Sequence, residues 1–163
     1  MTLLDFFQRL EDSPFSQALL ESQYAYPVIE SVHVLSLALS VGLLAVADLR
    51  LAGAYMRREP VAESLEQLRP WMLAGFVLMF ASGIVLFVAE AAKVWVKPMF
   101  QIKMVFLALA AANAVYFELT LGRRVHDWGG KPRLPAGATI AGALSLVCWA
   151  VVILCGRWVA YGL

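Results

Sequence analysis

Four long apolar segments dominate this sequence of 163 residues and leave few folds open to it. A helix that crosses a bilayer needs about 20 mostly apolar residues. Segments of that length run at about 27–49, 71–94, 100–121 and 135–161. Because lipid offers no hydrogen bonds to the backbone, such segments span it as helices. The sequence therefore predicts an all-α integral membrane four-helix bundle, in which the whole chain forms one membrane domain.

Composition supports a membrane location and excludes other classes of protein. The chain is 61% hydrophobic and 15% charged, whereas soluble domains are roughly 45–50% apolar and about 25% charged. A disordered chain needs low hydrophobicity and high charge. The net charge is +1 and no basic run is interleaved with aromatic residues, so nucleic acid is not an expected partner. The expected partner is the lipid bilayer, and the absence of a catalytic motif argues against an enzyme.

The N-terminal segment, residues 1–25, has a different pattern. Apolar residues such as Phe7 and Leu10 alternate with charged ones such as Glu11, and Pro14 interrupts the pattern. This alternation predicts a broken amphipathic segment that lies at the membrane surface. A helix packed against another subunit is the alternative.

Proline and glycine indicate where the helices end. Pro27 and Pro70 are expected to start the first two spans, because the missing N–H of proline would be unpaired there in any case. Pro98 is expected to break the chain between the second and third spans. Residues 127–132 predict the third connection, since the sequence DWGGKP cannot continue a helix.

Lys and Arg residues favour one orientation in the membrane. Short cytoplasmic loops carry an excess of these residues. The first and third connections together carry eight of the 13, namely Arg50, Arg57, Arg58, Arg69, Arg123, Arg124, Lys131 and Arg133. We therefore expect a multi-pass protein of the bacterial inner membrane, with both termini on the non-cytoplasmic side.

Polar residues follow one face of each span. At 100° per residue, the polar residues of the first span other than Ser31 fall within about 120° of one another, and they are Glu30, His33, Ser36, Ser40 and Asp48. Polar side chains hydrogen-bond between helices in lipid, and small residues let helices approach closely. These faces are therefore predicted to point into the bundle. At the cytoplasmic end, inter-helix pairs and interface anchors are expected from Asp48, Arg50, Glu118, Arg123 and Arg124.

Six ionisable residues are predicted to gather at the outer end of the bundle. A charged side chain in a span costs at least ~2.5–3.5 kcal/mol at the helix centre, so this arrangement is the most informative feature of the sequence. The six residues are Glu30, His33, Glu90, Lys93, Lys103 and Arg157. A mutual ion-pair network accounts for much of the cluster. With His33 neutral one positive charge remains, which favours an anionic or carbonyl-bearing ligand.

His33 is the expected centre of a cofactor site, as a ligand or as a proton-exchanging group, because histidine titrates near neutral pH. Glu30 would orient it, and Lys103 and Arg157 would receive negative charge. Haem b and quinone are the candidate cofactors, and Met104 is a candidate second ligand for haem. A copper site would also need Cys155. The Glu-x-x-His spacing of di-iron bundles occurs once, at residues 30–33, and a di-iron centre needs two copies. His126 is expected in a solvated loop on the opposite side, and no metal site is predicted.

Motifs along the chain carry a resemblance to a known family. They are IESVHVL at 29–35, DLRLAG at 48–53, FQIK at 100–103, Asn113 and GRWVAY at 156–161. These motifs resemble those of a family of uncharacterised bacterial four-helix membrane proteins, a domain of unknown function, over nearly the whole chain. That resemblance implies a fold but no chemistry. A looser similarity to copper-resistance membrane proteins and to small haem-binding four-helix proteins implies copper or haem at His33.

Three functions follow from these observations. The first is a small inner-membrane subunit whose outward polar pocket binds quinone or haem, in electron or proton transfer. The second is a permease-like protein for a small solute or copper, which would have to oligomerise because the chain is short and shows no clear inverted repeat. The third is a non-catalytic scaffold in a larger membrane complex. The expected protein partners are copies of the chain or other subunits.

Overall fold

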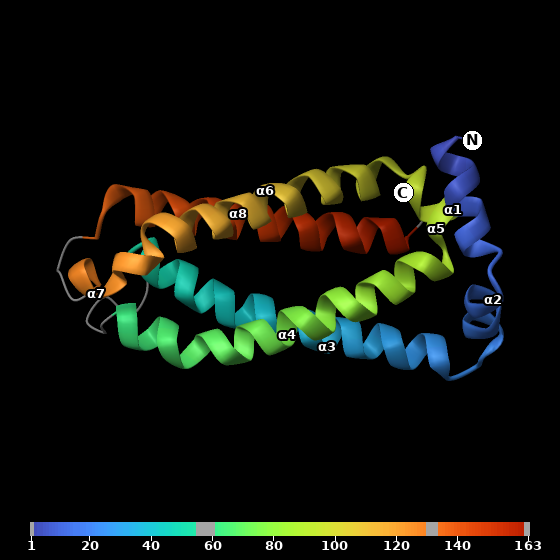
Figure 1. Cartoon of the computed structure of the whole chain (residues 1–163), viewed down its shortest axis with the longest axis horizontal. Helices are drawn as coiled ribbons and strands as arrows, with labels where there is room; N and C mark the ends of the chain where they lie inside the picture. The colour runs from blue at the N-terminus through green and yellow to red at the C-terminus, as the bar shows by residue number, and fades with distance from the viewer. Residues whose placement is uncertain (1, 55–60, 130–133, 162–163) are drawn as a thin grey trace.

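The computed structural model describes residues 2–54, 61–129 and 134–161. No strand occurs in these ranges, and four of the helices are long and apolar enough to cross a membrane. They are α3 (Ala25–Leu51), α4 (Val61–Ala89), α6 (Pro98–Thr120) and α8 (Ala136–Ala160) (Figure 1). The predicted all-α four-helix bundle is confirmed, and the chain is a multi-pass membrane protein.

The four long helices pack as two pairs. Helix α3 runs along α4 and α6 runs along α8, while contacts between α3 and α8 join the pairs (Figure 1). Glycine residues let α3 approach both α4 and α8 closely. A Cβ atom at Gly75 of α4 would lie 2.9 Å from the Cβ of Ser40, and one at Gly142 of α8 would lie 2.8 Å from the backbone oxygen of Asp48. The close approach that small residues allow in lipid is therefore used at both interfaces of α3.

Two buried apolar clusters fill the bundle. The central cluster comprises Val41, Met79, Ala110, Cys148, Trp149 and Val152. The second cluster comprises Leu51, Phe117, Val125, Trp128, Ala138 and Ala141. In it, the indole N–H of Trp128 donates to the backbone oxygen of Leu121 at 3.1 Å. This bond fixes the short helix α7 (Val125–Trp128), which follows η1 (Gly122–Arg124), across that end of the bundle.

The second span differs from its predicted form at both ends. Pro70 does not start the helix but lies inside α4, so that expectation is wrong. Membrane helices tolerate an internal proline because neighbouring groups satisfy the freed carbonyl. At the other end α4 stops at Ala89, Glu90 adopts φ −132° and ψ 38°, and a separate helix, α5 (Ala91–Trp95), follows. Pro98, by contrast, occupies the first turn of α6, as expected.

The N-terminal segment forms α1 (Leu3–Glu11) and α2 (Pro14–Glu21), which lie across one end of the bundle (Figure 1). Phe7 packs against Phe87 and Trp95, with ring centroids 5.5 and 4.6 Å apart. The hydroxyl of Ser16 is fully buried and donates to the backbone oxygen of Ala89 at 2.9 Å. Phe7 and Ser16 therefore fasten this segment to its own bundle, while other large apolar side chains of the segment stay exposed, namely Leu3, Leu4, Phe6, Phe15 and Leu20.

Candidate functional site

The end of the bundle under α1 and α2, here called the covered end, holds all the residues predicted to form a site. The starts of α3 and α6, the end of α8 and the break between α4 and α5 meet there. The structure divides the six residues into a central couple with a nearby carboxylate, a surface ion pair and a separate arginine. These groups are His33, Lys103 and Glu30; Glu90 and Lys93; and Arg157.

His33 is held in one orientation by α4. Its Nδ1 lies 2.9 Å from the backbone oxygen of Met79 and 3.1 Å from the hydroxyl of Ser82. Because a carbonyl oxygen only accepts, we assign the proton to Nδ1, which leaves Nε2 as an acceptor. Nε2 has no hydrogen bond within the ranges that the structure describes. One nitrogen therefore anchors the ring and the other is available.

Gly83 makes room for this imidazole. A Cβ atom at Gly83 would lie 3.0 Å from Cε1 of His33, closer than side chains normally tolerate. The ring thus lies directly against the backbone of α4. No pattern in the sequence places Gly83 beneath His33, because the two residues lie on different helices.

Lys103 lies on the other helix pair, with its ammonium group against α8. It is partly buried, and its Nζ lies 3.7 Å from the position that a Cβ of Gly156 would occupy on α8. Its charge acts on His33, as does that of Glu30, which lies one turn earlier on α3. His33 and Lys103 therefore lie at the same end of the bundle, on different helix pairs.

Glu90 and Lys93 form a surface pair beside this couple. The Lys93 ammonium bonds the Glu90 carboxylate, which also accepts a hydrogen bond from the hydroxyl of Tyr26 at 3.2 Å. The hydrogen bond and the charge of Glu90 raise the pKa of Lys93 above its usual value. The side chain of Lys93 is 61% exposed, so the pair adds little stability.

Arg157 does not join the other five residues. It is exposed, donates to the hydroxyl of Tyr161 at 3.0 Å, and lies 5.3 Å from the centre of the same ring. The two residues are one turn apart on the same helix, where side chains meet. The contacts of Arg157 therefore lie at the end of its own helix.

Two residues that were not predicted to belong to the site form hydrogen bonds to the ends of other helices here. The Glu11 carboxylate of α1 accepts hydrogen bonds from the backbone N–H groups of Ala92 and Lys93, at 2.8 and 3.2 Å. Lys97 donates to the backbone oxygen of Val159 at 2.7 Å. Both contacts join segments far apart in the sequence, so no local pattern predicts them.

The arrangement of the described side chains gives little support to a metal site. In the described ranges no three His, Cys, Asp or Glu side chains are grouped as a metal ion requires. Met104 is 42% exposed, whereas Cys155 is buried with 4% of its surface exposed. Met104 and Cys155 therefore differ in their surroundings, although a copper site would need both.

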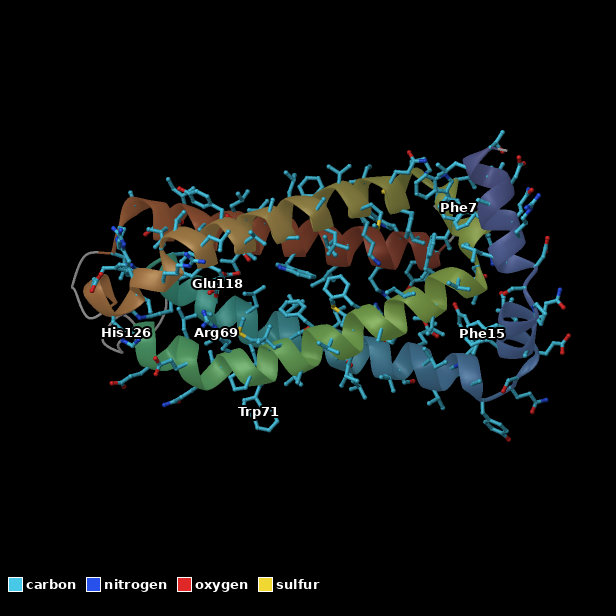
Figure 2. All side chains as sticks on the ribbon, viewed as in Figure 1. Phe7, Phe15, Arg69, Trp71, Glu118 and His126 are labelled. Atoms are coloured by element: carbon cyan, nitrogen blue, oxygen red, sulfur yellow. The ribbon has the colours of Figure 1, made fainter. Side chains whose placement is uncertain are left out.

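The opposite end of the bundle carries ion pairs between helices. Figure 2 shows Arg69 of α4 and Glu118 of α6 pointing towards each other, and the Arg69 guanidinium lies 2.6 Å from both carboxylate oxygens. Nε2 of His126 lies 3.1 Å from the Glu66 carboxylate, and both side chains are exposed. Glu118 thus forms the expected inter-helix pair, and its partner is Arg69. His126 belongs to α7 and not to a loop.

The fold and this site define a class: a multi-pass α-helical membrane protein with an oriented histidine and a lysine at one end of a four-helix bundle. The chain belongs to DUF6644, a family of unknown function, whose model matches residues 21–162. That match includes all four long helices and both His33 and Lys103. Comparison with curated proteins and with solved structures gave no match.

Proposed function

We propose that this protein is a small subunit of the bacterial inner membrane that binds a quinone at the covered end, on the non-cytoplasmic side. Lys103 would donate a hydrogen bond to a carbonyl oxygen of the quinone, and Nε2 of His33 would accept one from a hydroxyl group of the reduced quinol. The observation that carries the proposal is the orientation of His33, whose Nδ1 is anchored on Met79 while Nε2 lacks a partner in the described ranges.

The chemistry of the couple suits such a ligand. A bound quinone would supply the carbonyl groups that are reduced. The Lys103 ammonium donates hydrogen bonds only, as a carbonyl oxygen requires, and Nε2 of His33 can accept a proton from a hydroxyl group. Lys103 would therefore bind a carbonyl oxygen of the quinone, while His33 would exchange a proton with it.

An aromatic pair beside the couple favours a planar apolar ligand. The rings of Phe87 and Phe100 stack with centroids 5.3 Å apart and planes within 5°. Phe87 lies one turn beyond Gly83 on α4, and Phe100 lies one turn before Lys103 on α6. Residues at this spacing share a helix face, so the pair places apolar rings next to the His33–Lys103 couple.

The proposal is tested by what the protein retains through purification. Solvent extraction of protein purified in mild detergent, followed by chromatography, should yield close to stoichiometric quinone. The His33→Ala protein should lose it, because the oriented acceptor is gone. The His126→Ala protein, altered at an exposed histidine of the opposite end, should keep it. A protein free of quinone, which also fails to bind added short-chain quinone, would contradict the proposal.

Haem is the second candidate, and one observation favours it. An imidazole whose other nitrogen donates to a backbone carbonyl is the usual arrangement of a metal-ligating histidine, and His33 has it. A visible absorption spectrum separates the candidates. A Soret band that disappears in the His33→Ala protein would identify haem and overturn the quinone proposal.

A further inference from the structure

Asp48 is a buried carboxyl group inside the bundle, remote from the covered end. It lies near the end of α3 with 4% of its surface exposed. Ser145 of α8 hydrogen-bonds the carboxyl, and Oδ2 has no hydrogen-bond partner among the described residues. At this level a Cβ on Gly142 would lie 2.8 Å from the backbone oxygen of Asp48. The helices are thus in direct contact beside an incompletely satisfied carboxyl group.

The apolar stretches of the neighbouring helices bring no charge to this carboxyl group. Before residue 71, α4 carries Glu63, which is exposed, and Glu66 and Arg69, whose side chains are paired with His126 and Glu118. Residues 71–89 of α4, 104–117 of α6 and 136–156 of α8 contain no Asp, Glu, Lys, Arg or His. Their ionisable side chains are Tyr116, Cys148 and Cys155. Ser145, the residue that bonds Asp48, is neutral.

Two arginines lie on the helices near Asp48, but one is on another face of α3 and the other is paired with a glutamate. Arg50 is also buried, two positions after Asp48, and helical residues two apart do not face each other. Arg69 of α4 is paired with Glu118 of α6. Burial and the hydrogen bond with Ser145 therefore dominate the environment of the Asp48 carboxyl group.

Burial without a partner favours the neutral form of a carboxyl group. An uncompensated charge in an apolar interior costs far more than a neutral acid with one unsatisfied atom. Ionisable residues inside membrane segments also mark proton and ion pathways in many proteins. We propose that Asp48 is a proton-binding site, whose carboxyl group carries a bound proton at neutral pH in the folded protein. This inference is independent of quinone binding at His33.

Infrared spectroscopy of the full-length protein in lipid nanodiscs tests the proton directly. A protonated carboxyl group gives a C=O band, separate from the carboxylate bands, that shifts in D₂O. We expect this band at neutral pH in the wild-type protein. It should be lost in the Asp48→Asn protein and kept in the Asp127→Asn protein, where the altered residue is exposed. Absence of any band that depends on Asp48 would overturn the proposal.

Two further measurements show whether loss of the band in the Asp48→Asn protein could result from misfolding. Labelling the aspartates of the wild-type protein with ¹³C should shift the band, and an unshifted band would contradict its assignment to an aspartate. Asparagine resembles the neutral acid in shape and charge, so Asp48→Asn should leave the thermal midpoint of unfolding unchanged or raised. A drop of many degrees would show that the charged form supports the fold, and would overturn the proposal.

Discussion

Gly83 decides where the imidazole of His33 can lie. The ring rests against the backbone of α4 at this one position, while its Nδ1 is bonded to Met79. Orientation of the histidine thus depends on a missing side chain as much as on a hydrogen bond. In lipid, where the helices are equally apolar on many faces, such close approaches define the geometry.

Replacement of Gly83 by alanine should therefore weaken ligand binding. The added Cβ would lie 3.0 Å from Cε1 of His33 and displace the ring. A strain of about 1.4 kcal/mol corresponds to a tenfold loss of affinity, which a titration with a short-chain quinone would measure. Gly42→Ala is the control, because a Cβ there meets nothing within 4 Å. Equal affinities in the two variants would contradict this role of Gly83.

Sequence analysis predicted one cluster of six ionisable residues at the covered end, but not which of them bond to one another. Helical periodicity gave the face of each span, and the polar face of α3 contacts α4 and α8. It also included Arg157, because 100° per residue ignores where a long side chain turns. Arg157 contacts Tyr161, one turn later on the same helix, and this local contact separates it from the couple.

At the scale of helices, the break after Ala89 depends on α1. The backbone N–H groups at the start of α5 would lack partners, and the Glu11 carboxylate of α1 accepts hydrogen bonds from two of them. The apolar pattern of residues 71–94 gives no sign of a break, because the capping residue lies in another helix. This is why the predicted span ran through Glu90.

Removal of this cap should loosen both helices. We expect Glu11→Ala to cost about 1 kcal/mol, the usual value for a lost helix cap, since the N–H groups of Ala92 and Lys93 lose their acceptor. Hydrogen exchange followed by mass spectrometry should show faster exchange in α1 and α5. The Glu21→Ala protein, altered at an exposed residue of α2, should exchange as the wild type does. Unchanged exchange in the Glu11→Ala protein would count against the cap.

For the whole molecule, the number and type of spans followed from the sequence, while their packing did not. Segment length and hydropathy suffice to predict four membrane helices. The pairing of α3 with α4 and of α6 with α8 depends on contacts such as Gly75 against Ser40. The covering of one end by α1 and α2 likewise depends on tertiary contacts of Phe7 and Ser16.

The orientation predicted from the distribution of Lys and Arg residues can be tested with single cysteines. Both termini are predicted on the non-cytoplasmic side, so a cysteine replacing Asp127 in α7 should resist a membrane-impermeant maleimide in intact cells. A cysteine replacing Glu21 should react. The native Cys148 and Cys155 are buried and can be replaced by serine to remove background. The reverse labelling pattern would overturn the predicted topology.

The central claim is that Lys103 serves ligand binding and not the stability of the bundle. Methionine matches the length of lysine and removes a charge that is costly within a membrane helix. Thermal unfolding of the Lys103→Met protein, with and without a short-chain quinone, tests the claim most directly. We predict a midpoint equal to or above that of the wild type, and loss of the rise that quinone gives the wild-type protein. A lower midpoint together with an undiminished response to quinone would contradict the account.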